Sequence, residues 1–263
     1  MVDTIEKNLY LNDAQFYDLD TREVTKVDIP FYLEQAAKTS GGILELACGT
    51  GRITIPLANA GHEIWGVELS ESMIRQFKHK IKDLPKETSA RIHLIQGDMT
   101  NFSIPQKFPL IILPARSFQL LLDEEAESRC LKNIHAHLAD NGYLIIDVAN
   151  YAKDVDKGWV SDEEIFDWEN IDPATGYKVH RTHIKKEIDL ERHIICPLKI
   201  YHITKNDGSV EKIFKRSPWK YFYEDQIKSL ITGNGFKITS EMGSYDGKPI
   251  GEGSEFIFFC QKG

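Results

Sequence analysis

Short apolar runs alternate with amphipathic stretches between residues 43 and 148 of the chain. The runs have the length and β-branched content of buried strands, and the stretches between them repeat apolar residues at helical spacing. This alternation is typical of a parallel sheet covered by helices on both faces. The predicted strands are residues 42–47, 62–69, 90–98, 108–115 and 143–150. The predicted helices are residues 51–61, 70–84 and 123–142.

Local signals support these helices. Pro56 falls in the first turn of the first helix, where a missing N–H costs little, or it kinks the helix. In the second helix, Met73 and Phe77 recur four residues apart and form part of one buried face. Asp123 is a suitable N-cap for the third helix, and Gly142 is a suitable stop at its C-terminal end.

The pattern changes after residue 150. Turn signals recur as DPATG, DLERH and NDGS, which begin at residues 172, 189 and 206. The last of them lies between two strand-like segments and is a strong hairpin signal. We therefore expect three or four antiparallel strands within residues 159–222. The chain then returns to a predicted helix, residues 223–235, and two strands, residues 236–242 and 255–262.

These elements predict an α/β protein with a doubly wound, mostly parallel seven-stranded sheet and an antiparallel β insertion. N-terminal cap helices and the α/β core would occupy residues 1–150. The insertion would occupy residues 151–222, either as a lid or as a dimer interface. Residues 223–263 would complete the core sheet with a helix and the last two strands.

Composition narrows the classes of partner. The 263 residues are 41% hydrophobic and 27% charged, with a formal net charge of −8. This acidity argues against a large nucleic-acid footprint, which needs many Lys and Arg side chains against phosphates. No apolar run approaches the roughly 20 residues that span a bilayer, and residues 1–18 lack the apolar segment of a signal peptide. We therefore expect a cytoplasmic protein with no membrane partner.

The metal-binding residue types form no ligand pattern. The cysteines are far apart and lack CxxC spacing, which predicts reduced thiols and no metal site. The four cysteines are Cys48, Cys130, Cys196 and Cys260. His135 and His137 are two apart on a predicted helix, so they cannot share a ligand. His180 and His183 fall on opposite faces of a predicted strand, so at most one of them can face a pocket.

Three consecutive strand ends carry unusual residues. ELACGTG follows the first strand, Glu68 ends the second and Asp98 follows the third. Ligands of open α/β sheets bind outside the carboxyl ends of the strands, so we expect these residues to lie close together. Gly49 and Gly51 allow close approach of the backbone near a helix N-terminus, where a carboxylate is favoured. Glu68 can accept from a ribose diol, Asp98 from an adenine amine, and Glu45 can face an ammonium.

The glycine turn departs from two other ligand-binding turns. A dinucleotide-binding turn needs a third glycine where Thr54 stands, and a phosphate-binding P-loop needs Lys where Arg52 stands. A tight turn without any ligand remains open. Glu68 alone could stabilise a helix N-terminus, and Asp98 alone could be a turn acid.

A ligand with a carboxylate, an ammonium, a ribose and an adenine is S-adenosylmethionine. With these residues the chain resembles the class I S-adenosylmethionine-dependent methyltransferases over about residues 41–148, and residues 221–262 resemble the C-terminal part of small-molecule members. The resemblance implies a Rossmann-like methyltransferase fold, S-adenosylmethionine as cofactor and S-adenosylhomocysteine as its product. The chain departs from the family pattern at Ala47, where a glycine is usual.

The resemblance also implies roles for individual residues. The implied cofactor-binding residues are Tyr17, Glu45, Ala47, Gly49, Gly51, Arg52, Glu68, Leu69, Met73, Asp98, Met99, Pro114 and Ala115. The candidates for the substrate pocket are Arg116, Phe118, Gln119 and Tyr221. Amino-sugar N-methyltransferases of this build place a histidine soon after the fourth strand, and here Gln119 stands at about that position. No catalytic base is therefore assigned.

The leading hypothesis is a methyltransferase that moves a methyl group to N or O of a small molecule by in-line displacement. The alternatives are an RNA or protein methyltransferase and a non-catalytic module that binds S-adenosylmethionine. Net acidity argues against RNA, and the chain lacks the Asn/Asp-Pro-Pro-Tyr/Phe run with which many nucleic-acid enzymes grip a flipped base. The oligomeric state is open, with a homodimer as one option.

Overall fold

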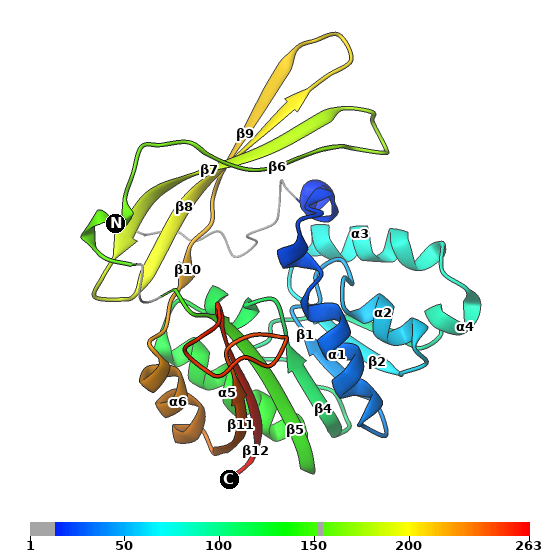
Figure 1. Cartoon of the computed structure of the whole chain (residues 1–263). Helices are drawn as coiled ribbons and strands as arrows, with labels where there is room; N and C mark the ends of the chain where they lie inside the picture. Colours follow the sequence, from blue (N-terminus) through cyan, green and yellow to red (C-terminus); the bar gives the residue numbers. More distant parts are fainter. Residues whose placement is uncertain (1–13, 152–154) are drawn as a thin grey trace.

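The computed structural model describes residues 14–151 and 155–263, which form two β-sheets with helices around the larger one (Figure 1). The larger sheet has the strand order β11-β12-β5-β4-β1-β2-β3. Its strands are β1 Ile43–Leu46, β2 Ile64–Glu68, β3 Ile92–Gln96, β4 Phe108–Leu113, β5 Leu138–Ala149, β11 Phe236–Met242 and β12 Glu255–Lys262. Only the pairs that involve β12 are antiparallel among them. The predicted mostly parallel seven-stranded sheet is confirmed.

Helices cover both faces of this sheet. Alternate side chains of β1 enter two separate cores, because successive residues of a strand point to opposite faces. Leu44 packs in a core with α5 and α6, and Ile43 packs in another with α1 and α2. The helices are α1 Asp28–Ala37, α2 Thr54–Asn59, α3 Glu71–Lys82, α4 Lys86–Ser89, α5 Glu124–His137 and α6 Glu224–Gly233. Short 3-10 helices are η1 Ala14–Leu19, η2 Glu23–Thr25, η3 Ser117–Leu120 and η5 Lys157–Trp159. Within the described ranges, no helix is long and apolar enough to cross a membrane.

The ends of α5 confirm one prediction and correct another. Asp123 caps the helix by accepting a backbone N–H of its first turn at 2.8 Å, as predicted. The predicted stop at Gly142 is wrong, because β5 already begins at Leu138. Leu138 is fully buried opposite Phe108, and this burial favours an extended backbone. Gly142 instead lets β5 pass the Phe108 carbonyl, which a Cβ would approach to 2.9 Å.

The second sheet, called here the roof sheet, is antiparallel throughout. Its strands are β6 Ile165–Ile171, β7 Lys178–Asp189, β8 Ile194–Thr204, β9 Val210–Arg216 and β10 Trp219–Lys220. The three turns predicted from the sequence join β6 to β7, β7 to β8 and β8 to β9. The prediction of three or four strands misses only the two-residue strand β10.

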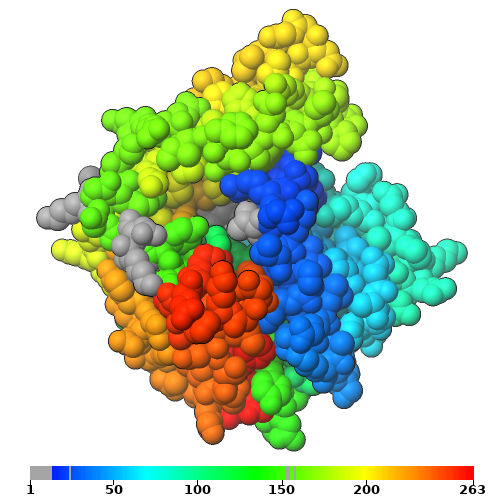
Figure 2. Space-filling view, viewed as in Figure 1, coloured from blue at the N-terminus to red at the C-terminus, as the bar shows by residue number. Residues whose placement is uncertain are grey.

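The N-terminal segment bridges the two sheets. Phe16 and Leu19 of η1 pack against Trp168 and Tyr201 of the roof sheet, whereas α1 packs on the core. The roof sheet extends across one end of the core, and β10 leads the chain from the roof sheet back to the core (Figure 1). Figure 2 shows a hollow between the roof sheet and the core, beside the blue N-terminal segment.

Candidate active site

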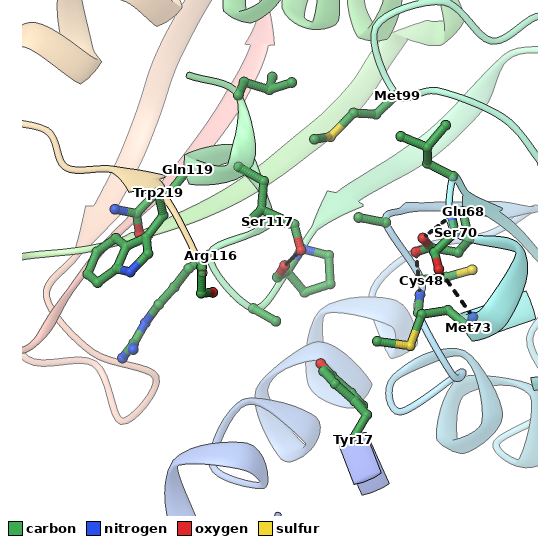
Figure 3. A pocket seen from close by; sticks show the side chains of 18 of the residues that line it. Tyr17, Cys48, Glu68, Ser70, Met73, Met99, Arg116, Ser117, Gln119 and Trp219 are labelled. Carbon is green, nitrogen blue, oxygen red and sulfur yellow. Dashed lines mark hydrogen bonds between the residues drawn. The ribbon is translucent and has the colours of Figure 1, made fainter. Parts of the chain in front are cut away.

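A cavity of about 640 Å³ lies where β1 to β4 end. This volume is in the range of small-ligand pockets, roughly 300–1,000 Å³. The core strand ends supply its floor, β7 and β8 its roof, and η1 one side. Figure 3 shows Tyr17 pointing into the cavity, with Glu68 and Met73 on one side and Arg116 and Trp219 on the other. The predicted cofactor residues that line it are Tyr17, Glu45, Ala47, Gly49, Arg52, Glu68, Leu69, Met73, Asp98, Met99, Pro114 and Ala115.

The turn after β1 is built from residues in the left-handed backbone region. Ala47, Gly49 and Gly51 have φ values of 55°, 57° and 84°. A Cβ on Gly49 would meet no atom within 4 Å, whereas a Cβ on Gly51 would lie 2.3 Å from Cε2 of Phe77. Gly49 therefore keeps cavity space open, and Gly51, which does not line the cavity, allows α3 to pack against the turn.

Ala47→Gly is expected to raise the free energy of unfolding by up to about 1 kcal/mol. A Cβ costs about 1–2 kcal/mol at this φ, and the extra chain entropy of glycine offsets part of the gain. Urea unfolding followed by circular dichroism measures the change. Ala37→Gly, the same replacement at the exposed last residue of α1, is the control and should lower the free energy of unfolding by less than the roughly 1 kcal/mol of a helix interior. A lower urea midpoint for Ala47→Gly would contradict the prediction.

Glu45 is a buried carboxylate at the floor of the cavity. It is 2% exposed, and its Oε2 accepts the Thr54 hydroxyl at 2.5 Å. Burial raises the pKa of Glu45 to about 8, and the Thr54 bond and the nearby Arg52 only partly offset this effect. A cationic ligand group beside Glu45 would be stabilised by the carboxylate and would favour its ionised form.

Glu68 ends β2 with both oxygens oriented by backbone amides. Oε2 accepts the N–H of Gly49 at 2.9 Å, and Oε1 accepts that of Ser70 at 2.7 Å. Burial raises the pKa of Glu68 despite these bonds. The Leu69 amide also stabilises this carboxylate, and a carboxylate has about four acceptor positions, so acceptor capacity remains for a ligand hydroxyl. Glu68 therefore shapes the glycine turn as well as lining the cavity.

The third strand end adds a carboxylate flanked by apolar side chains. Asp98 is exposed, and its Oδ1 accepts the Thr100 N–H at 2.8 Å. Leu69 is 48% exposed although it is apolar, and Met99 is partly buried against the core. A planar ring that carries an amine fits between such groups, because its faces need apolar contact and its edge needs an acceptor.

The turn after β4 depends on Asp147, at the carboxyl end of β5. Ala115 and Arg116 have φ values of 59° and 62°, which are costly for residues with a Cβ. The Asp147 carboxylate accepts their two N–H groups at 3.2 and 2.6 Å and the Tyr32 hydroxyl at 2.6 Å. Burial raises the pKa of Asp147 to about 6. This fully buried carboxylate thus holds the cavity wall in a strained conformation.

Arg116 is engaged by the last strand. Its Nε donates to Glu255 Oε2 at 3.0 Å, and a terminal nitrogen donates to the other carboxylate oxygen. Its guanidinium also lies 5.5 Å from the centre of the Tyr151 ring. Arg116 lines the cavity as predicted for a substrate-pocket candidate, while Glu255 fixes its position.

Arg52 fastens the N-terminal segment to the glycine turn. Its guanidinium donates to both oxygens of Asp28 at 2.5 and 2.6 Å and to the Thr25 carbonyl at 2.8 Å. Burial raises the pKa of Tyr17, and the nearby Arg52 partly offsets this. A direct cofactor contact of Arg52 stays a prediction, since these bonds show it holding the segment that carries Tyr17.

Two substrate-pocket candidates do not line the cavity. Phe118 is fully buried and stacks on Phe222 with ring centres 5.9 Å apart. Tyr221 is 1% exposed and packs with Val155 and Ile195. Burial removes these large rings from water, and Trp219 lines the cavity. A substrate role for Phe118 and Tyr221 stays a prediction.

Gln119 lines the cavity, but its amide holds other parts of the chain. Its Oε1 accepts the Ala149 N–H at 2.7 Å, and its Nε2 donates to the Lys220 carbonyl at 2.6 Å. It therefore joins the end of β5 to β10. A carboxamide does not take up a proton near neutral pH, so Gln119 braces the site and does not act as a base.

The sequence analysis offered the insertion as a lid but did not identify the charged residues with which it lines the cavity. The lining residues from the roof sheet and β10 include Asp167, Arg181, His183, Lys199 and Trp219. The spacing of two between Arg181 and His183 shows that they share a strand face. His183 lines the cavity, while His180 stacks on His202 with ring centres 4.1 Å apart, consistent with opposite faces.

The chain is similar in sequence to known methyltransferases. A family model described as "Methyltransferase domain" matches residues 43–142. A methyltransferase of Geobacillus sp. (strain WCH70) is 24% identical over 88% of this chain and 87% of its own length. The dTDP-3-amino-3,4,6-trideoxy-alpha-D-glucopyranose N,N-dimethyltransferase of Streptomyces venezuelae is 28% identical over 51% of this chain and 53% of its own length, so the chain spans about half of that relative.

A solved structure extends the likeness to most of the chain. An S-adenosylmethionine-dependent methyltransferase from Clostridium acetobutylicum ATCC 824 superposes with a TM-score of 0.74 and 19% identity, over 94% of each chain. At this identity the superposition shows the shared fold. The sequence match identifies residues 43–142 as a methyltransferase domain, and the superposition shows that the chain shares the fold of S-adenosylmethionine-dependent methyltransferases.

Proposed function

We propose that the chain transfers the methyl group of S-adenosylmethionine to nitrogen or oxygen of a small molecule. The Streptomyces venezuelae relative is named as an N,N-dimethyltransferase of a dTDP-linked amino sugar. A cavity of about 640 Å³ under the roof sheet suits an acceptor of limited size. The net charge of −8 disfavours RNA as the acceptor. In this proposal residues 151–222 act as a lid over the acceptor.

One observation carries the fit to this cofactor. Two buried carboxylates with raised pKa values, Glu45 and Glu68, flank the glycine turn on the floor of one cavity. S-adenosylmethionine brings an ammonium that suits Glu45 and a ribose diol that suits the remaining acceptor capacity of Glu68. Asp98 would accept from the adenine amine, and the open side of Gly49 leaves room for the methionine end.

The cofactor supplies a methyl group already activated on a positively charged sulfur. The chain's task is to hold the acceptor in line and to keep water out. The Pro114–Ser117 turn, fixed by Asp147, would border the transfer path on one side and Tyr17 on the other. A neutral amine needs no protein base, whereas a hydroxyl gains from one.

Calorimetric titration with S-adenosylmethionine tests the cofactor roles. Glu68→Ala and Asp98→Ala should each weaken binding by about tenfold or more, since each removes hydrogen bonds to a charged acceptor. Glu71→Ala, which removes a 69% exposed carboxylate from α3, is the control and should bind as the unmodified chain does. Unchanged affinity in both test variants would show that the assigned roles are wrong.

The class of acceptor needs a separate experiment. Methyl-labelled cofactor is incubated with the chain and a cell extract, which is then split into small and large molecules. Label in the small fraction supports the proposal, and label in protein or RNA supports a macromolecular acceptor. Cofactor that binds but is never consumed in any extract points to a non-catalytic module.

Binding of S-adenosylmethionine at pH 7 is expected to release up to one proton. The pKa of Glu45 is about 8 in the free chain, so this group is mostly protonated at pH 7. An ammonium beside it lowers that pKa, and the complex then holds fewer protons than the free chain. Affinity for S-adenosylmethionine should therefore rise between about pH 6 and pH 7.5. In this range the ligand's own amino group stays mostly charged, because its ordinary pKa is about 8.

Titrations in two buffers of different ionisation enthalpy measure this proton. The observed heat should differ between the buffers for the unmodified chain and agree between them for Glu45→Gln. Equal heats for the unmodified chain would contradict the prediction.

A further inference from the structure

Carboxylates lie on the floor of the cavity, and basic side chains lie on its roof. The floor carries Glu45 and Glu68, and its arginines Arg52 and Arg116 pair with Asp28 and Glu255. The roof carries Arg181, His183 and Lys199 beside one carboxylate, Asp167. The chain as a whole has a net charge of −8, so a basic wall is not a general property of its surface. The two sides of the cavity therefore suit ligand groups of opposite charge.

The roof residues are gathered by strand register. His183 of β7 is the direct partner of Lys199 on β8, and Arg181 follows the same face of β7 two residues away. Basic side chains directly opposite each other destabilise a sheet when both are charged. An anion bound between His183 and Lys199 would remove this cost.

Acidic neighbours engage Arg181 and His183 on the roof. Asp167 accepts Arg181 Nε at 2.9 Å and interacts with His183 Nδ1 at 3.0 Å. Burial raises the pKa of Asp167, but the opposing effects of the His183 bond and of Arg181 are together larger and lower it to about 2. Asp20 lies 3.4 Å from a terminal nitrogen of Arg181 and 2.7 Å from one of Arg22. Within residues 14–151 and 155–263, His183 Nε2 makes no hydrogen bond that would occupy it.

We propose that the methyl acceptor carries an anionic group, a phosphate or a carboxylate, which binds to Lys199, His183 and Arg181 on the roof. This inference rests on the proposed function, because it treats the roof as the acceptor side. Fastening η1 to the roof accounts for the pairs of Arg22 and Arg181 with Asp20, and the register of β7 and β8 adds Lys199 beside His183 on the same cavity wall. Anchoring the acceptor at the roof leaves its reactive end free to approach the Pro114–Ser117 turn.

Calorimetric titration of the full chain, saturated with S-adenosylhomocysteine, tests the anion site. The probes are inorganic pyrophosphate and malonate at low ionic strength, where screening is weak. At least one probe is expected to bind, and the tighter one identifies phosphate or carboxylate as the recognised group. Lys199→Gln should weaken that binding by about tenfold or more, since it removes a charged hydrogen-bond donor.

The control is Lys212→Gln, which makes the same charge change on β9. Lys212 is exposed and pairs with His202, so it lies on the opposite face of the roof sheet and outside the cavity. It should bind the probe as the unmodified chain does. Binding of neither probe, or equal weakening in the two variants, overturns the anion site. Failure to bind S-adenosylhomocysteine would instead overturn the proposed function, so the two failures are distinguishable.

Discussion

Asp147→Ala is expected to lower the free energy of unfolding by about 3 kcal/mol and to weaken binding of S-adenosylmethionine. The substitution leaves the Tyr32 hydroxyl and the N–H groups of Ala115 and Arg116 without their acceptor. Each unsatisfied buried donor costs about 1–3 kcal/mol, and cavity access by water reduces the cost for the two amides. The Pro114–Ser117 turn then relaxes from its positive φ values, which changes the cavity wall beside the proposed position of the cofactor's methyl group. Urea unfolding and calorimetric titration measure the two effects.

Tyr32→Phe is the matched control for this substitution. It removes one of the three hydrogen bonds to Asp147 and leaves both amide bonds of the turn in place. We expect a loss of about 1 kcal/mol and unchanged cofactor affinity. If Asp147→Ala destabilised the chain no more than Tyr32→Phe, the carboxylate would not hold the turn.

Gly51→Ala is expected to destabilise the fold by about 3 kcal/mol. The new Cβ would lie 2.3 Å from the ring of Phe77, which is fully buried, so α3 would have to shift. Overpacking of this kind costs about 1–3 kcal/mol, and the φ of 84° adds about 1–2 kcal/mol for a residue with a Cβ. Urea unfolding measures the loss.

Gly49→Ala should affect cofactor binding more than the stability of the fold. Its Cβ would meet no atom within 4 Å, so only the cost of a φ of 57° applies, about 1–2 kcal/mol. That Cβ would occupy space in the cavity, so cofactor affinity should fall by about tenfold or more, the equivalent of 1.4 kcal/mol. If Gly49→Ala were the less stable variant and still bound the cofactor normally, the division of roles between the two glycines would be wrong.

Much of the fold follows from local sequence signals. Strand and helix periods predict the core because each buried face repeats within one element. The hairpin turns were predictable because residues such as Asp207 and Gly208 favour turn conformations directly. The end of α5 was not, since burial of Leu138 against β4 decides it and this contact is distant in sequence. Gly142 was interpreted as a helix stop, although it serves strand packing.

The residues of the candidate site likewise include some that the sequence predicts and some that it does not. Glu45, Glu68 and Asp98 were predicted to lie together because strand ends of a parallel sheet share one edge. From the sequence, Asp147 is only one residue of an apolar strand. Its role in holding the turn depends on the positive φ values of Ala115 and Arg116, which are not glycines. No sequence pattern indicates such a turn. The face of the roof sheet was equally hidden, because alternation groups Arg181 with His183 without showing which face meets the cavity.

The packing of η1 has a consequence for the rate at which ligands are exchanged. Phe16 and Leu19 attach this helix to the roof sheet through apolar contacts. On the core side, Asp18 accepts the Thr50 hydroxyl at 2.7 Å and Lys80 Nζ at 2.9 Å. The Asp18–Lys80 pair is partly exposed, and such pairs contribute about 0–1 kcal/mol. η1 therefore links the roof sheet to the core, and loosening either set of contacts should speed the exchange of ligands through this side of the cavity.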